Sequence, residues 1–357
     1  MNTNDNTLEL TFNNLQIENF RGIKHLEIDD CKRINLLVGK NNSGKTSVLE
    51  AISLIVGVYN SGMPIGINDF VRSVLFKKNS EQTRYIFNNL DYNNHPRIIT
   101  QSTRDDAKRE LEISAYYPTQ ITSIPSLQNS TQNPLGLQYD FKINNEPYHA
   151  HYIEDTSPDK TIIQENPNFQ ESLPFHFVHA TKRFMIIDTF KEVIRNQQQR
   201  EIVEILNIID TNIKDLTIVG EDIYAKIEYT ERLMPIQLTG DGILRLLEIL
   251  VAIEGIKEQG GVLLIDEIEN GLHFSVLEKF WTVIYQAAEK YNVQIFATTH
   301  NIETLQYLKS AAEKGHQTFK DNVRVYSVLK QPDGSSKVYK GDYENLQTAT
   351  ENNLEMR

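Results

Sequence analysis

One eight-residue stretch, Gly-Lys-Asn-Asn-Ser-Gly-Lys-Thr at residues 39–46, limits the folds open to this chain more than any other feature. It matches the pattern G-x-x-x-x-G-K-[ST] and follows a short apolar run at Ile34–Val38, which suits a buried parallel strand. The next segment, Thr46–Val58, repeats apolar residues with the period of a helix. A strand, a glycine-containing loop and a helix in this order turn backbone N–H groups and the helix dipole towards a phosphate. The stretch therefore predicts a nucleotide site in an α/β protein.

The side chains of this loop predict ATP and Mg²⁺ as cofactors. Lys45 places a point charge against the β- and γ-phosphates, and the hydroxyl of Thr46 is a ligand for Mg²⁺. The two glycines let the backbone wrap around phosphates without a clash of Cβ atoms. We expect the nucleotide to be bound by Gly39, Asn41, Asn42, Ser43, Gly44, Lys45, Thr46 and Ser47.

A second apolar run ends in two carboxylates, because Val262–Ile265 leads directly into Asp266 and Glu267. Adjacent carboxylates after a buried strand are costly unless they meet a cation, and the carboxyl ends of strands are where α/β sheets bind ligands. We expect Asp266 to hold Mg²⁺, directly or through water. Glu267 is expected to accept a proton from the water that attacks the γ-phosphate. An ordinary capped strand is the alternative when the segment is taken alone.

A third apolar run, Val293–Thr298, is followed by Thr299 and His300. It is the next such run after the acidic one, and consecutive strands are usually neighbours in a sheet. We therefore expect His300 to hydrogen-bond the γ-phosphate and to complete a catalytic group with Lys45 and Glu267. The alternative for an isolated histidine is an ordinary surface or core position.

The segment Leu-Thr-Gly-Asp-Gly-Ile-Leu-Arg at residues 238–245 places two glycines before a long apolar helix, which is expected from Gly242 to about Gln259. Its backbone N–H groups can face a phosphate, but it contains no lysine. We expect it to be a lid over a nucleotide that another segment holds. The contacts are assigned to Thr239, Gly240, Asp241 and Gly242. A glycine turn with a helix cap is the alternative.

The formal net charge of −12 argues against nucleic-acid binding, since an acidic chain repels a phosphate backbone unless a local patch is basic. Two short basic stretches, Lys77-Lys78 and Arg104–Arg109, are more typical of solvated faces. The single cysteine, Cys31, excludes a disulfide framework or a thiolate metal site within one chain. Neither a signal-like segment nor a run of about 20 apolar residues is present, so a cytoplasmic protein without a membrane partner is expected.

The order of these motifs resembles the ABC-type ATPase heads of the SMC/RecF superfamily. A closer resemblance is to the OLD-like (overcoming lysogenization defect) ATPases. It is carried by five stretches, which are IENFRGIKHLEI, LVGKNNSGKTSVLEAI, TGDGILRLLEIL, LLIDEIENGLH and FATTHN. They make up about a sixth of the chain, although their order and spacing span nearly all of it.

The resemblance implies a P-loop NTPase fold of the ABC-ATPase head type, with a mixed sheet and helices. It implies two lobes, residues 1–186 and 216–357, and a short helical insert at residues 187–215. In that superfamily the glycine-rich signature of one subunit closes over the γ-phosphate bound by the other. The chain is therefore expected to form a homodimer or a higher homo-oligomer through ATP-sandwiching heads, with Glu269–His273 in the loop that meets the partner.

The resemblance also places Arg21 near the base or the α-phosphate, for which a charged residue in a hairpin turn is the alternative. A glutamine that senses Mg²⁺ belongs to the family pattern, and Gln82 and Gln101 are candidates without a motif behind either. Two segments complete the predicted organisation. Asp188–Ile213 is expected to be helical, and the polar, proline-dotted residues 145–172 predict a poorly ordered stretch or a lobe edge.

The departures from the family pattern shape the predicted function. No long coiled coil is present, which indicates a compact head, and the residues after His300 leave no room for the Toprim nuclease domain of full OLD nucleases. We therefore expect an ATPase switch that controls a separate effector, a nuclease or a toxin, as in two-component bacterial defence systems. A RecF-like repair factor that clamps DNA and a nucleotide-locked scaffold are alternatives. A transporter cassette is disfavoured because Thr239 lies far after Lys45 and the signature lacks Ser-Gly-Gly.

Overall fold

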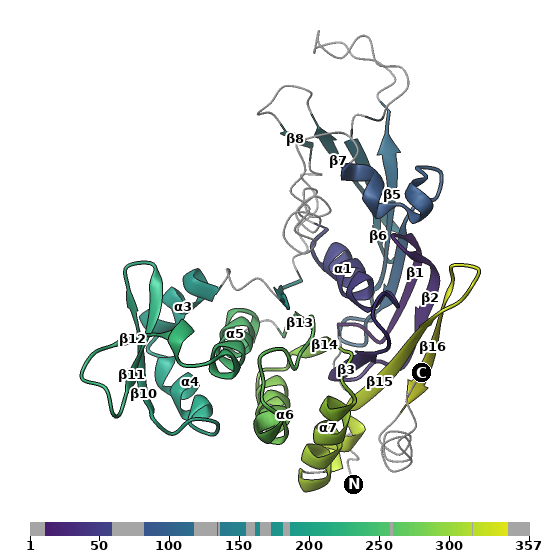
Figure 1. Ribbon diagram of the computed structural model, residues 1–357. Helices are drawn as coiled ribbons and strands as arrows, with labels where there is room; N and C mark the ends of the chain where they lie inside the picture. The colour runs from purple at the N-terminus through teal and green to yellow at the C-terminus, as the bar shows by residue number, and fades with distance from the viewer. Residues whose placement is uncertain are drawn as a thin grey trace, which may run out of the picture. The chain divides into compact units, whose positions relative to one another are not determined.

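The internal contacts of the computed structural model divide the chain into two compact units (Figure 1). The first comprises residues 1–31, 42–173 and 328–338, and the second comprises residues 32–41, 174–327 and 339–357. The structure describes residues 11–58, 82–117, 134, 136–154, 161–164, 173–180, 186–257, 260–315 and 317–341. Residues 32–41 belong to the second unit because the strand before the phosphate loop pairs with strands far along the chain. The predicted lobes, residues 1–186 and 216–357, stay a prediction.

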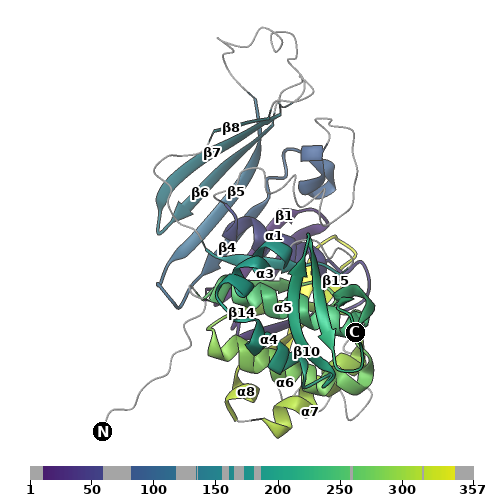
Figure 2. The ribbon, with the colours of Figure 1, turned by 90° about the vertical axis from the view of Figure 1, so that its left-hand side faces the viewer.

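A seven-stranded antiparallel sheet dominates the first unit, in the order β2-β1-β4-β5-β6-β7-β8 (Figure 2). Its strands are β1 (Asn14–Phe20), β2 (Ile23–Ile28), β4 (Arg97–Gln101), β5 (Lys108–Tyr116), β6 (Gly136–Ile143), β7 (Glu146–Glu154) and β8 (Thr161–Gln164). Helix α1 (Lys45–Val56) packs on β1 and β5, and two short 3-10 turns lie at Gln82–Ile86 and Asn88–Leu90. Residues 1–10, before β1, lie outside the described residues.

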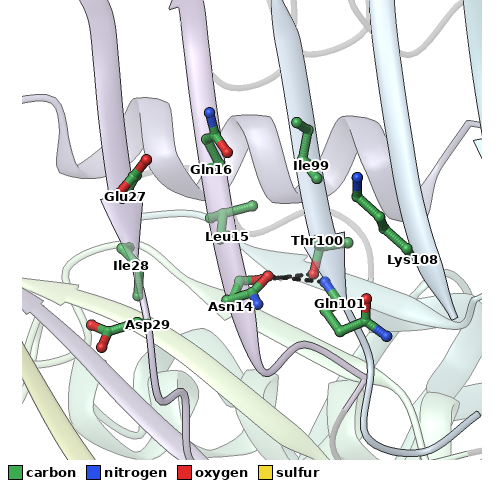
Figure 3. A pocket seen from close by; sticks show the side chains of 10 residues that line it. All are labelled: Asn14, Leu15, Gln16, Glu27, Ile28, Asp29, Ile99, Thr100, Gln101 and Lys108. Atoms are coloured by element: carbon green, nitrogen blue, oxygen red, sulfur yellow. Dashed lines mark hydrogen bonds between the residues drawn. The ribbon is translucent and has the colours of Figure 1, made fainter. Parts of the chain in front are cut away.

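The outer face of this sheet is polar. Gln16 and Gln101 alternate with the buried Leu15 and Thr100, as the two-residue period of a strand requires. A shallow hollow of about 390 Å³ lies on this face (Figure 3), where Asn14 accepts hydrogen bonds from the Thr100 hydroxyl and the Gln101 N–H. Gln101 thus belongs to the face that α1 does not cover. The side chain of Gln82, the other candidate for Mg²⁺ sensing, lies outside the described residues.

Residues 145–172 were expected to be a poorly ordered stretch or a lobe edge, and the structure describes residues 145–154 and 161–164 of this range. From Glu146 on, these described residues are ordered as strands β7 and β8, and β8 is the last strand of the sheet. A two-residue turn joins β6 to β7, with φ of 48° at Asn144 and 73° at Asn145. Two left-handed residues are typical of the tight hairpin turn that matches strand twist, and asparagine tolerates that conformation. Asn144 and Asn145 were the sequence signal of this hairpin turn, and the polar composition of the whole segment made that signal hard to recognise.

A six-stranded sheet dominates the second unit, in the order β16-β15-β3-β14-β13-β9. Its strands are β3 (Ile34–Val38), β9 (Phe175–Val178), β13 (Val262–Ile265), β14 (Gln294–Thr299), β15 (Val323–Lys330) and β16 (Ser336–Gly341). From β15 to β9 all neighbours run parallel, and every residue of β3, β13 and β14 is buried. Their complete burial and largely apolar sequences suit a parallel sheet that is covered on both faces. The carboxyl ends of β3, β14 and β13 consequently meet at one edge.

The helices of this unit are α3 (Ile186–Arg195), α4 (Gln199–Leu206), α5 (Asp241–Ile256), α6 (Phe274–Lys290), α7 (Ile302–Lys314) and α8 (Gln317–Asp321). Helix α5 packs against β9, β13, α3 and α6. A small sheet of β10 (Ile213–Val219), β11 (Asp222–Ile227) and β12 (Met234–Pro235) is followed by a 3-10 turn at Ile236–Leu238. Among the described residues no helix combines the length and the apolar character needed to cross a bilayer.

A single helix was expected at Asp188–Ile213, but the structure has two helices there, α3 and α4. The first helix ends because Gln197 adopts a left-handed backbone conformation. Its φ is 58°, and the N–H groups of Gln197 and Gln198 donate to the carbonyls of Ile194 and Val193. This is the Schellman pattern of a helix C-terminus, in which glycine usually takes the left-handed position. Glutamine in that position gave no sequence signal of a break.

Candidate nucleotide-binding site

The loop between β3 and α1 has the backbone geometry that its glycines predict. The φ angles are 150° at Gly39, 66° at Asn42 and 100° at Gly44. L-residues rarely adopt φ values as large as those of the two glycines, whereas asparagine tolerates the moderate value at Asn42. No side chain caps the start of α1, so the backbone N–H groups of its first turn are suited to an anion. Lys45 and Ser47 are buried.

The carboxylate of Asp266 is held at the end of β13. It is 7% exposed, and its Oδ1 accepts a 2.7 Å hydrogen bond from the hydroxyl of Thr298 on β14. The same hydroxyl oxygen accepts the Glu267 N–H at 2.8 Å. Thr298 therefore fixes the carboxylate and the backbone that follows it. The sequence prediction gave Thr298 no role, although it lies in the strand that precedes His300.

The side chain of Glu267 is 41% exposed and approaches His300, whose side chain is 48% exposed. The Nδ1 atom of His300 lies 3.7 Å from Oε1 of Glu267 and 3.7 Å from Oε1 of Glu269. Burial raises the pKa of Glu269, although hydrogen bonding from Thr299 and the charge of His300 partly oppose that shift. An accessible carboxylate beside an imidazole can accept a proton from water.

The strand register brings three predicted segments to one edge of the six-stranded sheet. Val38 pairs with Thr299, and Ile265 pairs with Ala297 in parallel register. Gly39, which follows Val38, therefore leaves the sheet at the same edge as His300 and Asp266. This is where open α/β sheets bind ligands.

The side-chain types of the two predicted ligands suit Mg²⁺. Asp266 offers a carboxylate and Thr46 a hydroxyl, both hard oxygen ligands, and Mg²⁺ commonly takes one or two carboxylates together with phosphate oxygens and water. Within the described ranges there is no group of three or more His, Cys, Asp or Glu residues that could hold a metal without such a ligand.

The predicted signature turn lies at the surface and begins α5. Gly240 has φ 111° and ψ 147°, and no side chain caps the helix. Gly240 and Asp241 are exposed, whereas the hydroxyl of Thr239 donates to the Ile236 carbonyl at 2.7 Å. A Cβ added at Gly240 would meet no atom within 4 Å. The turn is thus accessible, and its first N–H groups can donate hydrogen bonds to an anion that another molecule presents.

Arg21 lies in the hairpin turn between β1 and β2 with φ 52°, which was the alternative kept for it. Its Nε lies 2.7 Å from Oε2 of the fully buried Glu50 on α1, and its carbonyl accepts the Asn88 side-chain amide. The ion pair ties the turn to the helix that follows the phosphate loop. Contact with a nucleotide stays a prediction for Arg21.

Comparison with known proteins identifies the family. Residues 34–306, which include every motif of the site except Arg21, match the family described as "AAA domain, putative AbiEii toxin, Type IV TA system". The chain belongs to this family. Two curated proteins are similar to this member of the AAA-domain family. An ATP/GTP phosphatase of Helicobacter pylori is 25% identical over 336 residues, covering 85% of this chain and 90% of that protein. The DNA replication and repair protein RecF of Francisella tularensis is 24% identical over 215 residues, 56% of this chain and 60% of that protein.

Solved structures show the fold of this AAA-domain protein. The SMC head domain of Thermotoga maritima matches with a TM-score of 0.51 and 11% identity over 93% of this chain and 99% of that one. An Smc head domain bound to the C-terminal domain of ScpA, from Pyrococcus furiosus, matches with a TM-score of 0.54 and 12% identity over 96% and 99%. The predicted ABC-head fold is confirmed, and the chain is a P-loop ATPase of the ABC/SMC/RecF superfamily.

Proposed function

We propose that this chain is an OLD-like ATPase that works as a nucleotide-dependent dimerisation switch. The observation that carries the proposal is the signature turn, which is exposed, uncapped and without a lysine of its own. Such a turn can contribute backbone N–H groups to an anion, but it lacks the side-chain charge that holds a nucleotide. A second copy that already holds ATP supplies the missing charge through its own Lys45.

The large apolar side chains near this turn support pairing of two heads. Leu238, which precedes the turn, is 71% exposed, and Phe274, which begins α6, is 52% exposed. Exposed apolar surface of this kind is often covered by a partner protein. Gly242 in the signature turn contacts Leu272, because a Cβ placed on Gly242 would lie 3.4 Å from that side chain. Leu272 lies two residues before Phe274, so the segment that contains Leu238 packs against the segment that contains Phe274.

Hydrolysis in the closed pair follows from the residues at the strand ends. Asp266 and Thr46 would hold Mg²⁺, which would supply positive charge to the phosphates when bound. Glu267 accepts a proton from the attacking water as its oxygen bonds to the γ-phosphorus and the bond to the bridging oxygen breaks. The bridging oxygen keeps the electron pair, so ADP is the leaving group. His300 donates a hydrogen bond to the transferred phosphoryl group, and Lys45 balances its charge.

We assign the output of the switch to a separate effector, a nuclease or a toxin. The family description names a putative toxin and a type IV toxin–antitoxin system, which supports a role in a two-component system. ATP would join two heads, hydrolysis would separate them, and the effector would respond to the paired state. In this proposal the protein works in the cytoplasm, with ATP and Mg²⁺ as cofactors.

The test is the mass of the Glu267→Gln variant in solution. It binds ATP but cannot accept the proton, so size-exclusion chromatography with light scattering should show a dimer with Mg-ATP and a monomer with ADP. Glu303→Gln removes the charge of an exposed glutamate on α7 and serves as the control, which should show no trapped dimer. The same mass for Glu267→Gln with and without ATP would reject the switch.

A RecF-like clamp on duplex DNA is the second candidate, favoured by the similarity to RecF. One of the two basic stretches offers it little support, because Arg109 is 1% exposed and paired with Asp105. Lys77-Lys78 lies outside the described residues. A clamp predicts ATP-dependent binding of duplex DNA that weakens steeply across a salt series, measured by fluorescence anisotropy. Equal, weak anisotropy with and without ATP would remove this candidate.

A further inference from the structure

Arg245 is a buried cation on α5 whose hydrogen-bonding groups face backbone carbonyls. The side chain is 4% exposed, and its Nη1 donates to the His179 carbonyl at 2.8 Å. Its Nη2 donates to the carbonyls of Asp266 at 2.7 Å and Glu267 at 3.2 Å. Glu248, one helical turn later, lies 3.6 Å away and balances its charge. Burying a charged guanidinium costs free energy, so we expect Arg245 to do more than fill space.

The backbone that Arg245 contacts is strained. Glu267 has φ 50°, a left-handed conformation that residues other than glycine adopt rarely and that tends to occur at functional sites. The hydroxyl of Thr298 accepts its N–H, and Nη2 of Arg245 donates to its carbonyl. The candidate base is therefore held from both sides, once by the neighbouring strand and once by the signature helix.

The signature turn also contacts the loop that follows Glu267. A Cβ built on Gly271 would lie 2.9 Å from Cβ of Asp241, and a Cβ on Gly242 would lie 3.4 Å from the Gly271 carbonyl oxygen. Glycine is required at position 271, where the close approach and the φ of 78° both disfavour a side chain. Helix α5 thus contacts the acidic strand end at two places, through Arg245 and through its first turn.

We propose that Arg245 is a positioning residue that couples the signature helix to the general base Glu267. The proposal rests on the proposed function, in which the signature turn of each subunit caps the ATP of the other. When α5 docks on the partner's nucleotide, Arg245 holds the backbone of Glu267 in its own subunit in the conformation that hydrolysis needs. Each ATP site then reports its closure to the other, and hydrolysis depends cooperatively on ATP concentration.

The test compares Arg245→Lys with Arg33→Lys. Arg33 is also a buried arginine, 8% exposed, and it donates to the Ala288 carbonyl and the Asn292 side chain away from the site. Arg245→Lys keeps the charge but loses the planar fork that reaches three carbonyls. It should bind ATP with a Kd within about twofold of the parent, lose about a hundredfold in kcat, and show a Hill coefficient near one. Arg33→Lys should retain the parental kcat and cooperativity, even if its Tm falls.

A second measurement separates positioning from general damage to the fold. In the Glu267→Gln background the base is already absent, so adding Arg245→Lys should lower residual hydrolysis little further. A fully multiplicative loss in the double variant would overturn the proposal, as would parental kcat and cooperativity in folded Arg245→Lys. If the parent itself shows neither ATP-dependent dimers nor cooperativity, the proposed switch and the coupling both fail. A selective kcat loss in Arg245→Lys would still support the positioning of Glu267 in that case.

Discussion

Nδ1 of His300 lies 3.7 Å from Oε1 of Glu267, and the two side chains come from the ends of neighbouring parallel strands. Both are about half exposed, so water can reach the carboxylate and the imidazole together. Glu269 approaches the same nitrogen from the buried side. The imidazole is thus placed between an accessible carboxylate, suited to proton transfer, and a buried one, suited to holding its position.

His300→Ala should lower kcat by roughly 10²-fold, because loss of one donor to the developing charge has that order of effect. The Kd for ATP should stay near the parental value, since the phosphate loop is intact. Steady-state hydrolysis and fluorescent-nucleotide titration measure the two quantities. His25→Ala, at an exposed position of β2, is the control and should keep the parental kcat. A raised Kd with an unchanged kcat at His300 would show a role in binding instead.

Lys45→Ala should abolish nucleotide binding without unfolding the chain. At an ATP concentration of 100 Kd, binding stabilises the parent by about 2.7 kcal/mol and raises its Tm. The variant should show no such rise, because the phosphates have lost their point charge. Thermal unfolding with and without Mg-ATP measures this, and Lys24→Ala, at an exposed lysine of β2, should respond as the parent does. An ATP-dependent Tm shift of parental size in Lys45→Ala would contradict the assignment.

Burial raises the pKa of Glu269 above the 4.5 of a free glutamate, so the folded chain binds this proton more tightly than the unfolded chain. The group contributes most to stability below pH 4.5, and that contribution is lost as pH rises through the folded pKa. Glu269→Gln removes this loss. Its free energy of unfolding relative to the parent should therefore increase with pH, measured by urea unfolding between about pH 4 and 8. Parallel pH profiles for parent and variant would contradict this.

The pKa of Asp105 is shifted in the opposite direction, below the value of a free aspartate. Burial alone would raise its pKa, but hydrogen bonds from Arg109 and Ser102 lower it to about 2. The stability that this carboxylate contributes is present above pH 3.8 and is lost as pH falls towards 2. Asp105→Asn should reduce the free energy of unfolding by about 1 kcal/mol at neutral pH, with the difference shrinking in acid. Urea unfolding against pH checks this, with the adjacent Asp106→Asn as control. A deficit that persists unchanged in acid would point to packing instead.

The sequence predicted those parts of the fold in which each residue is of the type that its backbone conformation favours. The strands β3, β13 and β14 and the helices α1 and α5 lie within a few residues of their predicted positions. The loop pattern requires a glycine at position 39, and Gly39 has a φ of 150°, which other residues rarely adopt. The break at Gln197 and the β6–β7 hairpin could not be predicted with the same ease, because glutamine and asparagine occupy backbone positions where glycine is the usual signal.

Tertiary contacts account for the site residues that the sequence did not reveal. Arg245 belongs to the TGDGILRLLEIL stretch, but a charged residue in a helix is usually solvated. Only the tertiary fold places its guanidinium within hydrogen-bonding distance of the carbonyls of Asp266 and Glu267. Thr298 was predicted to be a strand residue, and its hydroxyl acquires a role because β14 pairs with β13. The ion pair of Arg21 with Glu50 likewise joins residues that no local pattern connects.

The most direct test of ATP shared between two copies is to mix two inactive variants. Lys45→Ala cannot hold ATP but keeps its signature turn, whereas Thr239→Asp holds ATP but presents a negative charge to its partner's γ-phosphate. Random pairing gives dimers of which half are mixed, each with one complete site, so hydrolysis should return to at most about a quarter of the parental rate. Either variant alone should stay inactive. No regain of hydrolysis on mixing, or a parental rate for Thr239→Asp by itself, would contradict a site built from two subunits.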